Sequence, residues 1–237
     1  MSLPSMNVAP LGSIPGLRPA ILGMDASGTR ASAALFRPGG GPSHELAAAE
    51  GERAGTVLHA LVAEVLEAEG LRVADLAAVA CVRGPGSFTG LRVALATASG
   101  LACAGRVPGA GVETTRAVAA ASGDEGVVVV VLDGGQGRVF VGVHAVSGGL
   151  ASPVDGPRDA SLDEALAMVR ARAPGAHALL RGEPPRADEL RAAGCAPFTA
   201  PLALAAARLA CADGAAHDPL EALYARPVAI RPGGGST

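Results

Sequence analysis

The chain has 237 residues, of which 49% are hydrophobic and only 2% aromatic, and its formal net charge is −3. This length suffices for one large or two modest domains, whose cores alanine, valine and leucine must fill. All 19 basic residues are arginines, which excludes a Walker-type phosphate lysine and a Schiff-base lysine. The slightly acidic balance argues against a broad basic surface for nucleic acid.

The ends of the chain and its cysteines point to no special chemistry. Residues 1–19 contain four prolines and no basic run before an apolar core, so we expect a flexible leader rather than a signal peptide. We expect a flexible tail at 233–237, and we find no apolar stretch long enough to cross a membrane. Widely spaced cysteines predict buried free thiols in a reducing cytoplasm: Cys81, Cys103, Cys195 and Cys211.

The folded part opens with a strand, an aspartate and a hairpin, and this pattern occurs twice. The apolar run 20–24 leads to Asp25, and residues 31–36 return as a second strand. Residues 129–143 repeat this order around Asp133, at an offset of 108 residues. One such hairpin is an ordinary turn, although actin-like ATPases also place their first phosphate loop there. Two copies predict two related lobes.

Residues 56–69 have the pattern of an amphipathic helix, with Gly70 placed to end it. The simplest interpretation is a helix that lies on the first sheet. Because its apolar face is wider than one sheet contact needs, a partner interface is the second interpretation.

A glycine-rich bend joins an apolar strand pattern at 76–82 to a helix pattern at 91–104. Ser87 or Thr89 can cap the helix, and the glycines allow positive φ or a close backbone approach. A tight turn explains such glycines, and the first amides of the helix would also suit an anion.

The bend also carries a family resemblance. Residues 83–92 read Arg-Gly-Pro-Gly-Ser-Phe-Thr-Gly-Leu-Arg, and the helix behind them is rich in small residues. This string resembles the signature of the TsaB (YeaZ) family, whose members are partners in making threonylcarbamoyladenosine on transfer RNA. The second hairpin matches that family's Asp-x-x-x-Gly-x-Val-[Tyr/Phe] segment, with Phe140 in the aromatic place. The resemblance spans about residues 20–232 and is most specific in 79–112, whereas the closing motif at 227–232 lacks the family's tyrosine.

The resemblance implies a two-lobed α/β fold of the actin-like (ASKHA, ribonuclease H-like) superfamily, with a mixed sheet and flanking helices in each lobe. Residues 20–112 would form the N-terminal, partner-binding lobe. Residues 113–232 would form the C-terminal lobe, whose last helix would be able to pack back on the first lobe.

For function, the resemblance implies a non-catalytic scaffold or activator of the catalytic subunit TsaD. TsaD would form the threonylcarbamoyl group on N6 of the adenosine next to the anticodon, in tRNAs reading codons that begin with A. A TsaE-like ATPase would join the complex, tRNA would bind only through it, and the isolated chain would be a cytoplasmic homodimer. The implied interface residues are Leu58, Leu61, Val62, Val65, Leu91 and Leu95.

The histidines argue against metal chemistry and peptidase activity. The TsaD relatives carry two metal-binding histidines four residues apart, and the matching positions here are Thr114 and Val118. The five histidines of this chain are never closer than fifteen residues, so no His-x-x-x-His exists. We therefore expect no metal ligands and no catalytic residues, despite the glycoprotease label attached to the family.

The alternative hypothesis is a nucleotide-binding ATPase or small-molecule phosphotransferase of the actin-like superfamily, with two aspartates near phosphate and a hydrated metal. Against it, Ala26 and Arg30 crowd the first loop, and the motifs lack the full set of phosphate-loop glycines. We expect no intrinsic cofactor and at most weak binding of ATP or ADP with magnesium. The candidate phosphate-binding residues are Asp25, Ser27, Gly84, Gly86, Ser87, Thr89, Gly90 and Asp133.

Overall fold

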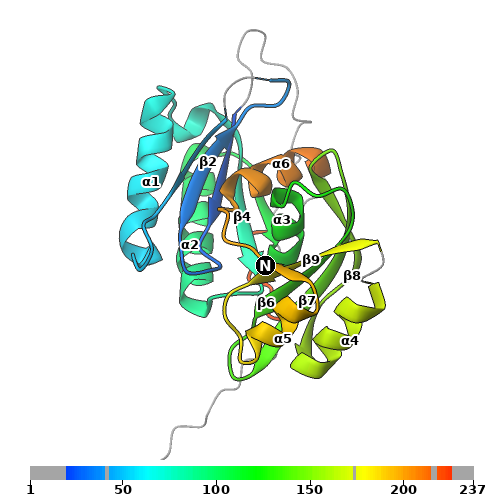
Figure 1. Cartoon of the computed structure of the whole chain (residues 1–237). Helices are drawn as coiled ribbons and strands as arrows, with labels where there is room; N and C mark the ends of the chain where they lie inside the picture. Colours follow the sequence, from blue (N-terminus) through cyan, green and yellow to red (C-terminus); the bar gives the residue numbers. More distant parts are fainter. Residues whose placement is uncertain (1–19, 41–42, 173–174, 215–217, 226–237) are drawn as a thin grey trace, which may run out of the picture.

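The computed structural model describes residues 20–40, 43–172, 175–214 and 218–225, which form two five-stranded sheets (Figure 1). The predicted leader, the predicted tail and the closing motif at 227–232 lie outside the described residues. In the first sheet the order is β3-β2-β1-β4-β5. Strand β2 is antiparallel to β1 and β3, whereas β4 runs parallel to β1 and β5. The strands are β1 (Ala20–Asp25), β2 (Ser32–Phe36), β3 (His44–Ala47), β4 (Leu76–Gly84) and β5 (Gly109–Glu113).

The second sheet repeats the first strand for strand. Its order is β10-β9-β6-β7-β8, with β7 antiparallel to β6 and β8, and with β9 parallel to β6 and β10. The strands are β6 (Gly126–Asp133), β7 (Arg138–Ser147), β8 (Leu150–Ser161), β9 (Ala176–Arg181) and β10 (Cys195–Pro197). This duplicated ribonuclease H-like order confirms the predicted two-lobed actin-like fold, and it places Asp25 and Asp133 at the ends of equivalent strands.

The helices form three layers around the two sheets (Figure 1). Helices α1 and α2 cover the outer face of the first sheet, α3 and α6 lie between the sheets, and α4 packs on β7 and β8. A short 3-10 turn, η1 (Val73–Asp75), precedes β4. The helices are α1 (Ala54–Ala68), α2 (Phe88–Gly105), α3 (Thr114–Ala121), α4 (Leu162–Arg172), α5 (Ala187–Ala192) and α6 (Ala203–Asp213).

Small residues let the central layer lie close to the sheets. Helix α6 contacts β1, β2 and β4, although it follows the strands of the second sheet in the chain. A Cβ on Gly23 would stand 1.9 Å from the Ala203 carbonyl oxygen, so only glycine permits this approach of α6 to β1. The alanines of α3 and α6 join valines of both sheets in one buried cluster, which binds the two lobes together.

The predicted interface side chains prove to be part of the chain's own core. Helix α1 packs on β2 and β3 and also against α2, so its wide apolar face is covered from two directions. In the folded chain these side chains therefore face the chain's own sheet and neighbouring helix, and most of them are closed to an outside partner. Five are buried and one half-buried: Leu58, Val62, Val65, Leu91, Leu95 and, half-buried, Leu61.

Helix α2 departs from one expectation drawn from the sequence. It is 18 residues long and, by length and composition alone, apolar enough to cross a membrane. This is weak evidence for a membrane span, because core helices of soluble proteins pass the same test. In the fold, α2 packs against β4 and α1.

The cysteines are free, and two of the four are buried. Burial raises the pKa of the Cys81 thiol and raises that of Cys195 to about 11, so both thiols stay protonated at neutral pH. Cys211 is half-buried, whereas Cys103 is exposed on α2. The prediction of buried thiols is therefore wrong for Cys103.

Candidate functional site

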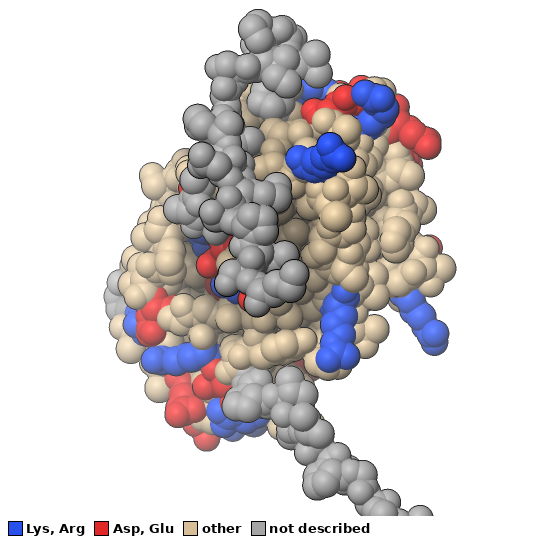
Figure 2. All heavy atoms as spheres, turned by 180° about the vertical axis from the view of Figure 1, so that it is seen from behind, with Lys and Arg blue, Asp and Glu red and all other residues tan. Residues whose placement is uncertain are grey.

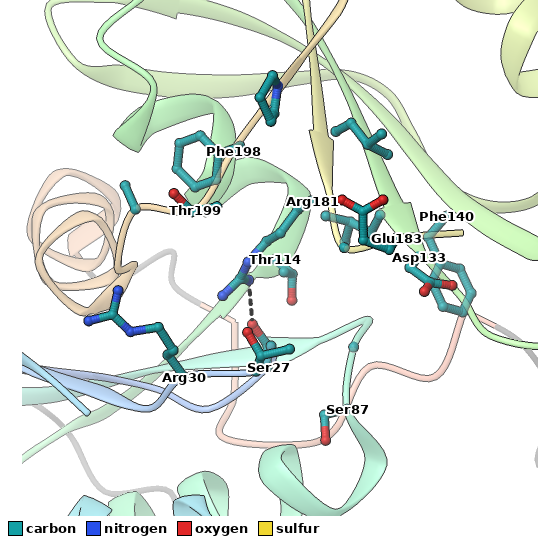
Figure 3. Close-up of a pocket in the computed structure, with 18 of the residues that line it drawn as sticks. Ser27, Arg30, Ser87, Thr114, Asp133, Phe140, Arg181, Glu183, Phe198 and Thr199 are labelled. Atoms are coloured by element: carbon teal, nitrogen blue, oxygen red, sulfur yellow. Dashed lines mark hydrogen bonds between the residues drawn. The ribbon is translucent and has the colours of Figure 1, made fainter. Parts of the chain in front are cut away.

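A cleft of about 1010 Å³ opens between the two lobes (Figure 3). Both hairpin tips line it, together with the glycine bend, the first residue of α3, the end of β9 and residues 197–201. Of the eight predicted phosphate-binding residues, four line the cleft: Ser27, Gly86, Ser87 and Asp133. The other four do not: Asp25, Gly84, Thr89 and Gly90.

The tip of the first hairpin is occupied by an arginine from the other lobe. Asp25 is fully buried, and its Oδ1 accepts a hydrogen bond from the Ser27 amide at 2.7 Å. The Arg181 guanidinium donates through Nη2 to Asp25 Oδ2 at 3.0 Å. It also donates through Nη1 to Ser27 Oγ at 2.8 Å, the bond dashed in Figure 3. A Cβ on Gly28 would stand 2.7 Å from Arg181 Nη2, so the hairpin backbone lies directly against the guanidinium. The charge that would bind magnesium is thus paired with a protein cation.

Arg181 is the main functional residue that the sequence analysis missed. It ends β9 and is followed by Gly182 at φ +91°, just as Arg83 is followed by Gly84 at φ +116° at the end of β4. In the first lobe the arginine pairs with Asp218 instead, through Nη2 and Oδ2 at 2.8 Å. The shared Ala-x-x-Arg-Gly string at the ends of these equivalent strands was a usable signal.

The second hairpin presents its aspartate to the cleft. Asp133 is half-buried, and its Oδ1 accepts a hydrogen bond from the Gly135 amide at 2.8 Å. A Cβ on Gly182 would stand 2.7 Å from the Asp133 Cβ, so β9 ends against this side chain as well. The end of β9 therefore touches both repeated aspartates, pairing with one and packing on the other.

The glycine bend packs on the first hairpin. The Ser87 amide donates to the Ser27 carbonyl at 2.8 Å, and a Cβ on Gly86 would stand 2.4 Å from the same oxygen. Ser87 is the N-cap of α2, since its Oγ accepts a hydrogen bond from the Gly90 amide at 3.3 Å. Thr89 is exposed and outside the cleft. Close packing explains the glycines, and phosphate binding at the bend stays a prediction.

The charges that line the cleft balance one another. Three arginines face three carboxylates there, so the cleft has no excess positive charge to attract a polyphosphate. Among the residues that the structure describes, no group of three or more His, Cys, Asp and Glu is placed to hold a metal ion. The charged lining residues are Arg30, Arg181, Arg191, Glu50, Asp133 and Glu183.

Helix α3 begins in a buried polar network below the cleft. The Glu113 carboxylate caps α3 by accepting hydrogen bonds from the Thr115 and Arg116 amides. Thr115 Oγ1 donates to Glu113 Oε2 and lies 2.7 Å from His144 Nε2. Because a hydroxyl has one proton, His144 donates from Nε2 when Glu113 is ionised, whereas a protonated Glu113 can donate to Thr115 Oγ1 and leave the hydroxyl proton for His144. Thr114, one of the two positions predicted to replace metal-binding histidines, lines the cleft from this helix end.

Glu113 and His144 are better described as a neutral pair than as an ion pair, although their side chains are 3.8 Å apart. Burial raises the pKa of Glu113 to about 7. Burial and, to a lesser degree, the Arg116 cation lower the pKa of His144 to about 4. Both shifts favour the uncharged forms in the folded chain.

The two groups change the stability of the folded chain in opposite directions as pH changes. The contribution of Glu113 to the free energy of unfolding falls as pH rises from about 4.5 to about 7. The contribution of His144 falls as pH drops from about 6.5 to about 4. Between these limits we expect the contributions of these two groups to the free energy of unfolding nearly to cancel. Glu113→Gln should lose ~3 kcal/mol as pH falls from 6.5 to 4, and His144→Gln should lose ~3 kcal/mol as pH rises from 4.5 to 7. Urea unfolding at several pH values tests this, and parallel curves for all three proteins would contradict it.

Comparison with known proteins decides the family. A family model described as TsaD: tRNA N6-adenosine threonylcarbamoyltransferase matches residues 51–188, more than half of the chain. The tRNA threonylcarbamoyladenosine biosynthesis protein TsaB of Escherichia coli K12 is 35% identical over 100 residues. The chain belongs to the TsaD family, in its TsaB (YeaZ) branch. The aligned part is 42% of this chain and 42% of the E. coli TsaB, less than half of that relative's length.

Two solved structures from Pseudomonas aeruginosa share the fold over their whole length. A protein described as similar to the peptidase YEAZ has a TM-score of 0.70 at 20% identity, covering 88% of this chain and 100% of that one. YeaZ has a TM-score of 0.68 at 18% identity, covering 87% and 99%. The predicted TsaB (YeaZ) resemblance is thereby confirmed, and these structures agree with the two-lobed fold.

Proposed function

We propose that this TsaB-type chain takes part in making threonylcarbamoyladenosine on tRNA, as a non-catalytic scaffold or activator of a TsaD-type subunit. That subunit would form the threonylcarbamoyl group on N6 of the adenosine next to the anticodon, in tRNAs reading codons that begin with A. The observation that carries the non-catalytic part is the Arg181 guanidinium on Asp25, which takes the carboxylate that an actin-like phosphotransferase needs for its metal.

The outer faces of α1 and α2 are the surface that we assign to the TsaD-type partner. The two helices lie side by side (Figure 1), and Thr97 Oγ1 of α2 approaches His59 Nε2 of α1 at 3.4 Å. Small side chains let helices of another subunit approach closely. The small exposed residues on these faces are Ala60, Ala63, Ala96, Ser99, Gly100 and Cys103.

The remaining parts of the proposal follow the family. A TsaE-like ATPase would join the complex, the isolated chain would form a cytoplasmic homodimer, and ATP or ADP with magnesium would bind weakly at most. We propose that tRNA binds through the complex rather than through this chain alone. On the face in Figure 2, arginines and carboxylates are interspersed around the grey atoms, without a broad basic patch that would attract tRNA.

The complex with the TsaD-type subunit of the same organism is the test. We expect light scattering to show a one-to-one complex that Ala63→Arg and Ala96→Arg each abolish, because each places a long charged side chain on the outer helical surface. Ser152→Arg, on the exposed strand β8, is the matched control and should leave the complex intact. Failure of the unmodified chain to bind, even with ATP and the TsaE-like partner, would contradict the scaffold proposal.

The phosphotransferase hypothesis, in contrast to the scaffold proposal, requires the chain to be catalytic by itself. It requires magnesium-dependent ATP turnover by the isolated chain, with Asp25 released from Arg181. The balanced charge of the cleft and the buried Asp25 ion pair weigh against it.

A further inference from the structure

Two exposed aromatic side chains lie together beside the glycine bend. Phe88 is 42% exposed and Tyr224 44% exposed, and their ring centroids are 6.0 Å apart. The whole chain has only four phenylalanines and one tyrosine, so this pair is a large share of its aromatic content. Exposed apolar side chains that cluster are typical of interaction sites, whereas scattered ones are ordinary.

An arginine completes the cluster. The Arg92 guanidinium carbon lies 3.7 Å from the centroid of the Phe88 ring, one helical turn further along α2. None of the described carboxylates forms an ion pair with Arg92, and its side chain is exposed. The stacked guanidinium therefore keeps its N–H donors available for an outside acceptor.

The cluster is held in place by the backbone on both sides. The Leu223 amide donates to the Arg83 carbonyl at 2.8 Å, which fixes the residue before Tyr224 against the bend. A Cβ on Gly84 would stand 2.6 Å from the Leu223 carbonyl oxygen, so glycine is needed for this approach. Ser87 caps the helix that Phe88 begins. Rings positioned in advance lose little freedom when a partner binds.

Beside the rings lies a hollow of about 60 Å³, which has room for the end of an aliphatic side chain. Its lining is apolar and includes Pro85, Leu91 and Leu223 as well as both rings. Arg92 is the one charged residue among 88–105, so the cation stands next to a neutral helical surface. The complement of such a site is an apolar side chain beside a carboxylate.

We propose that Phe88, Arg92 and Tyr224 form an anchor site for a protein partner that inserts an apolar side chain beside the rings and sets a carboxylate against Arg92. This inference rests on the proposed function, because the site continues the outer face of α2 that we assign to the TsaD-type subunit. Aromatic and arginine side chains are the residues that most often dominate binding energy at protein interfaces.

Charge argues against two other occupants. A second copy docked on this site about a two-fold axis would bring Arg92 against Arg92, which like-charge repulsion disfavours. An RNA strand could stack a base on the rings, but it carries a phosphate at every nucleotide, whereas Arg92 is the one charged residue of 88–105 that could meet them. One protein carboxylate matches this one cation and is therefore the occupant that Arg92 favours.

Calorimetric titration of the full chain with the TsaD-type subunit tests the site. We expect Phe88→Ala, Tyr224→Ala and Arg92→Gln each to weaken binding about tenfold or more, and Arg92→Gln to flatten the salt dependence as well. Val154→Ala removes a side chain that is 61% exposed on β8 and should change the affinity less than about twofold. Phe88→Tyr keeps the ring and should bind like the unmodified chain, while circular dichroism verifies that each variant is folded.

The outcomes separate this inference from the proposed function. If the unmodified chain binds and the three variants bind equally well, the anchor site is wrong while the scaffold proposal stands. If the unmodified chain does not bind, the scaffold proposal is wrong, and the anchor site, which rests on it, is wrong as well. If the variants lose affinity for tRNA while their affinity for the subunit is unchanged, the site stacks RNA bases, and the protein anchor is overturned.

Discussion

Replacing Arg181 with methionine is expected to lower the free energy of unfolding by about 3–5 kcal/mol. The Arg181 side chain is 15% exposed and its partner Asp25 only 1% exposed, so the substitution leaves a buried carboxylate without its cation. Methionine fills a similar volume but donates no hydrogen bond to Asp25 or Ser27. Urea unfolding followed by circular dichroism measures the loss.

Two comparisons make this result specific to the bridge between the lobes. Asp25→Asn combined with Arg181→Met removes both charges and should recover a large part of the stability, because the buried amide has no charge to neutralise. Arg191→Met is the matched control, since Arg191 also lines the cleft but is 35% exposed and pairs with exposed carboxylates. It should lose less than about 1 kcal/mol. Equal losses for Arg181→Met and Arg191→Met would show that the bridge is not a buried ion pair.

The duplicated fold could be predicted because its signals are local. Each lobe begins with an apolar strand that ends at an aspartate and turns back through small residues, and the two copies are read directly from the sequence. Strand pairing then follows from the short turns and from the apolar run before the glycine bend. The structure places both aspartates, Asp25 and Asp133, at equivalent strand ends.

The state of Asp25 could not be predicted in the same way. Its partner Arg181 lies 156 residues further along the chain, on the other lobe, and only the placement of the two sheets brings them together. The burial of the predicted interface residues could not be foreseen for a related reason. The amphipathic pattern of 56–69 shows how many apolar residues face inward, but not that α2 and the sheet together cover Leu58, Val62 and Val65. Exposed residues such as Phe88 carry no pattern of their own, so the aromatic cluster emerged only with the structure.

Gly90→Ala is expected to destabilise the chain by about 2–3 kcal/mol, although alanine is normally the better helix former. A Cβ at this position would stand 2.0 Å from the Ala26 carbonyl oxygen, so α2 or the first hairpin has to move. Such a movement strains the hydrogen bond of 2.8 Å between the Ser87 amide and the Ser27 carbonyl. Faster hydrogen exchange at the Ser87 amide should therefore accompany the loss of stability.

Gly100→Ala, on the same helix, is the matched control and should act in the opposite direction. Apart from the neighbouring backbone of α2 itself, nothing lies within 4 Å of the Cβ that Gly100 would gain, so the substitution should stabilise the chain by about 0.5–1 kcal/mol through helix propensity. A loss of stability for Gly90→Ala with a gain for Gly100→Ala would mean that Gly90 is required for packing against the first hairpin, whether or not an anion binds at the bend. If Gly90→Ala were as stable as Gly100→Ala, the structure would have space for a Cβ at position 90. Close packing would then not explain the glycines of the bend, and an anion site would be the better explanation.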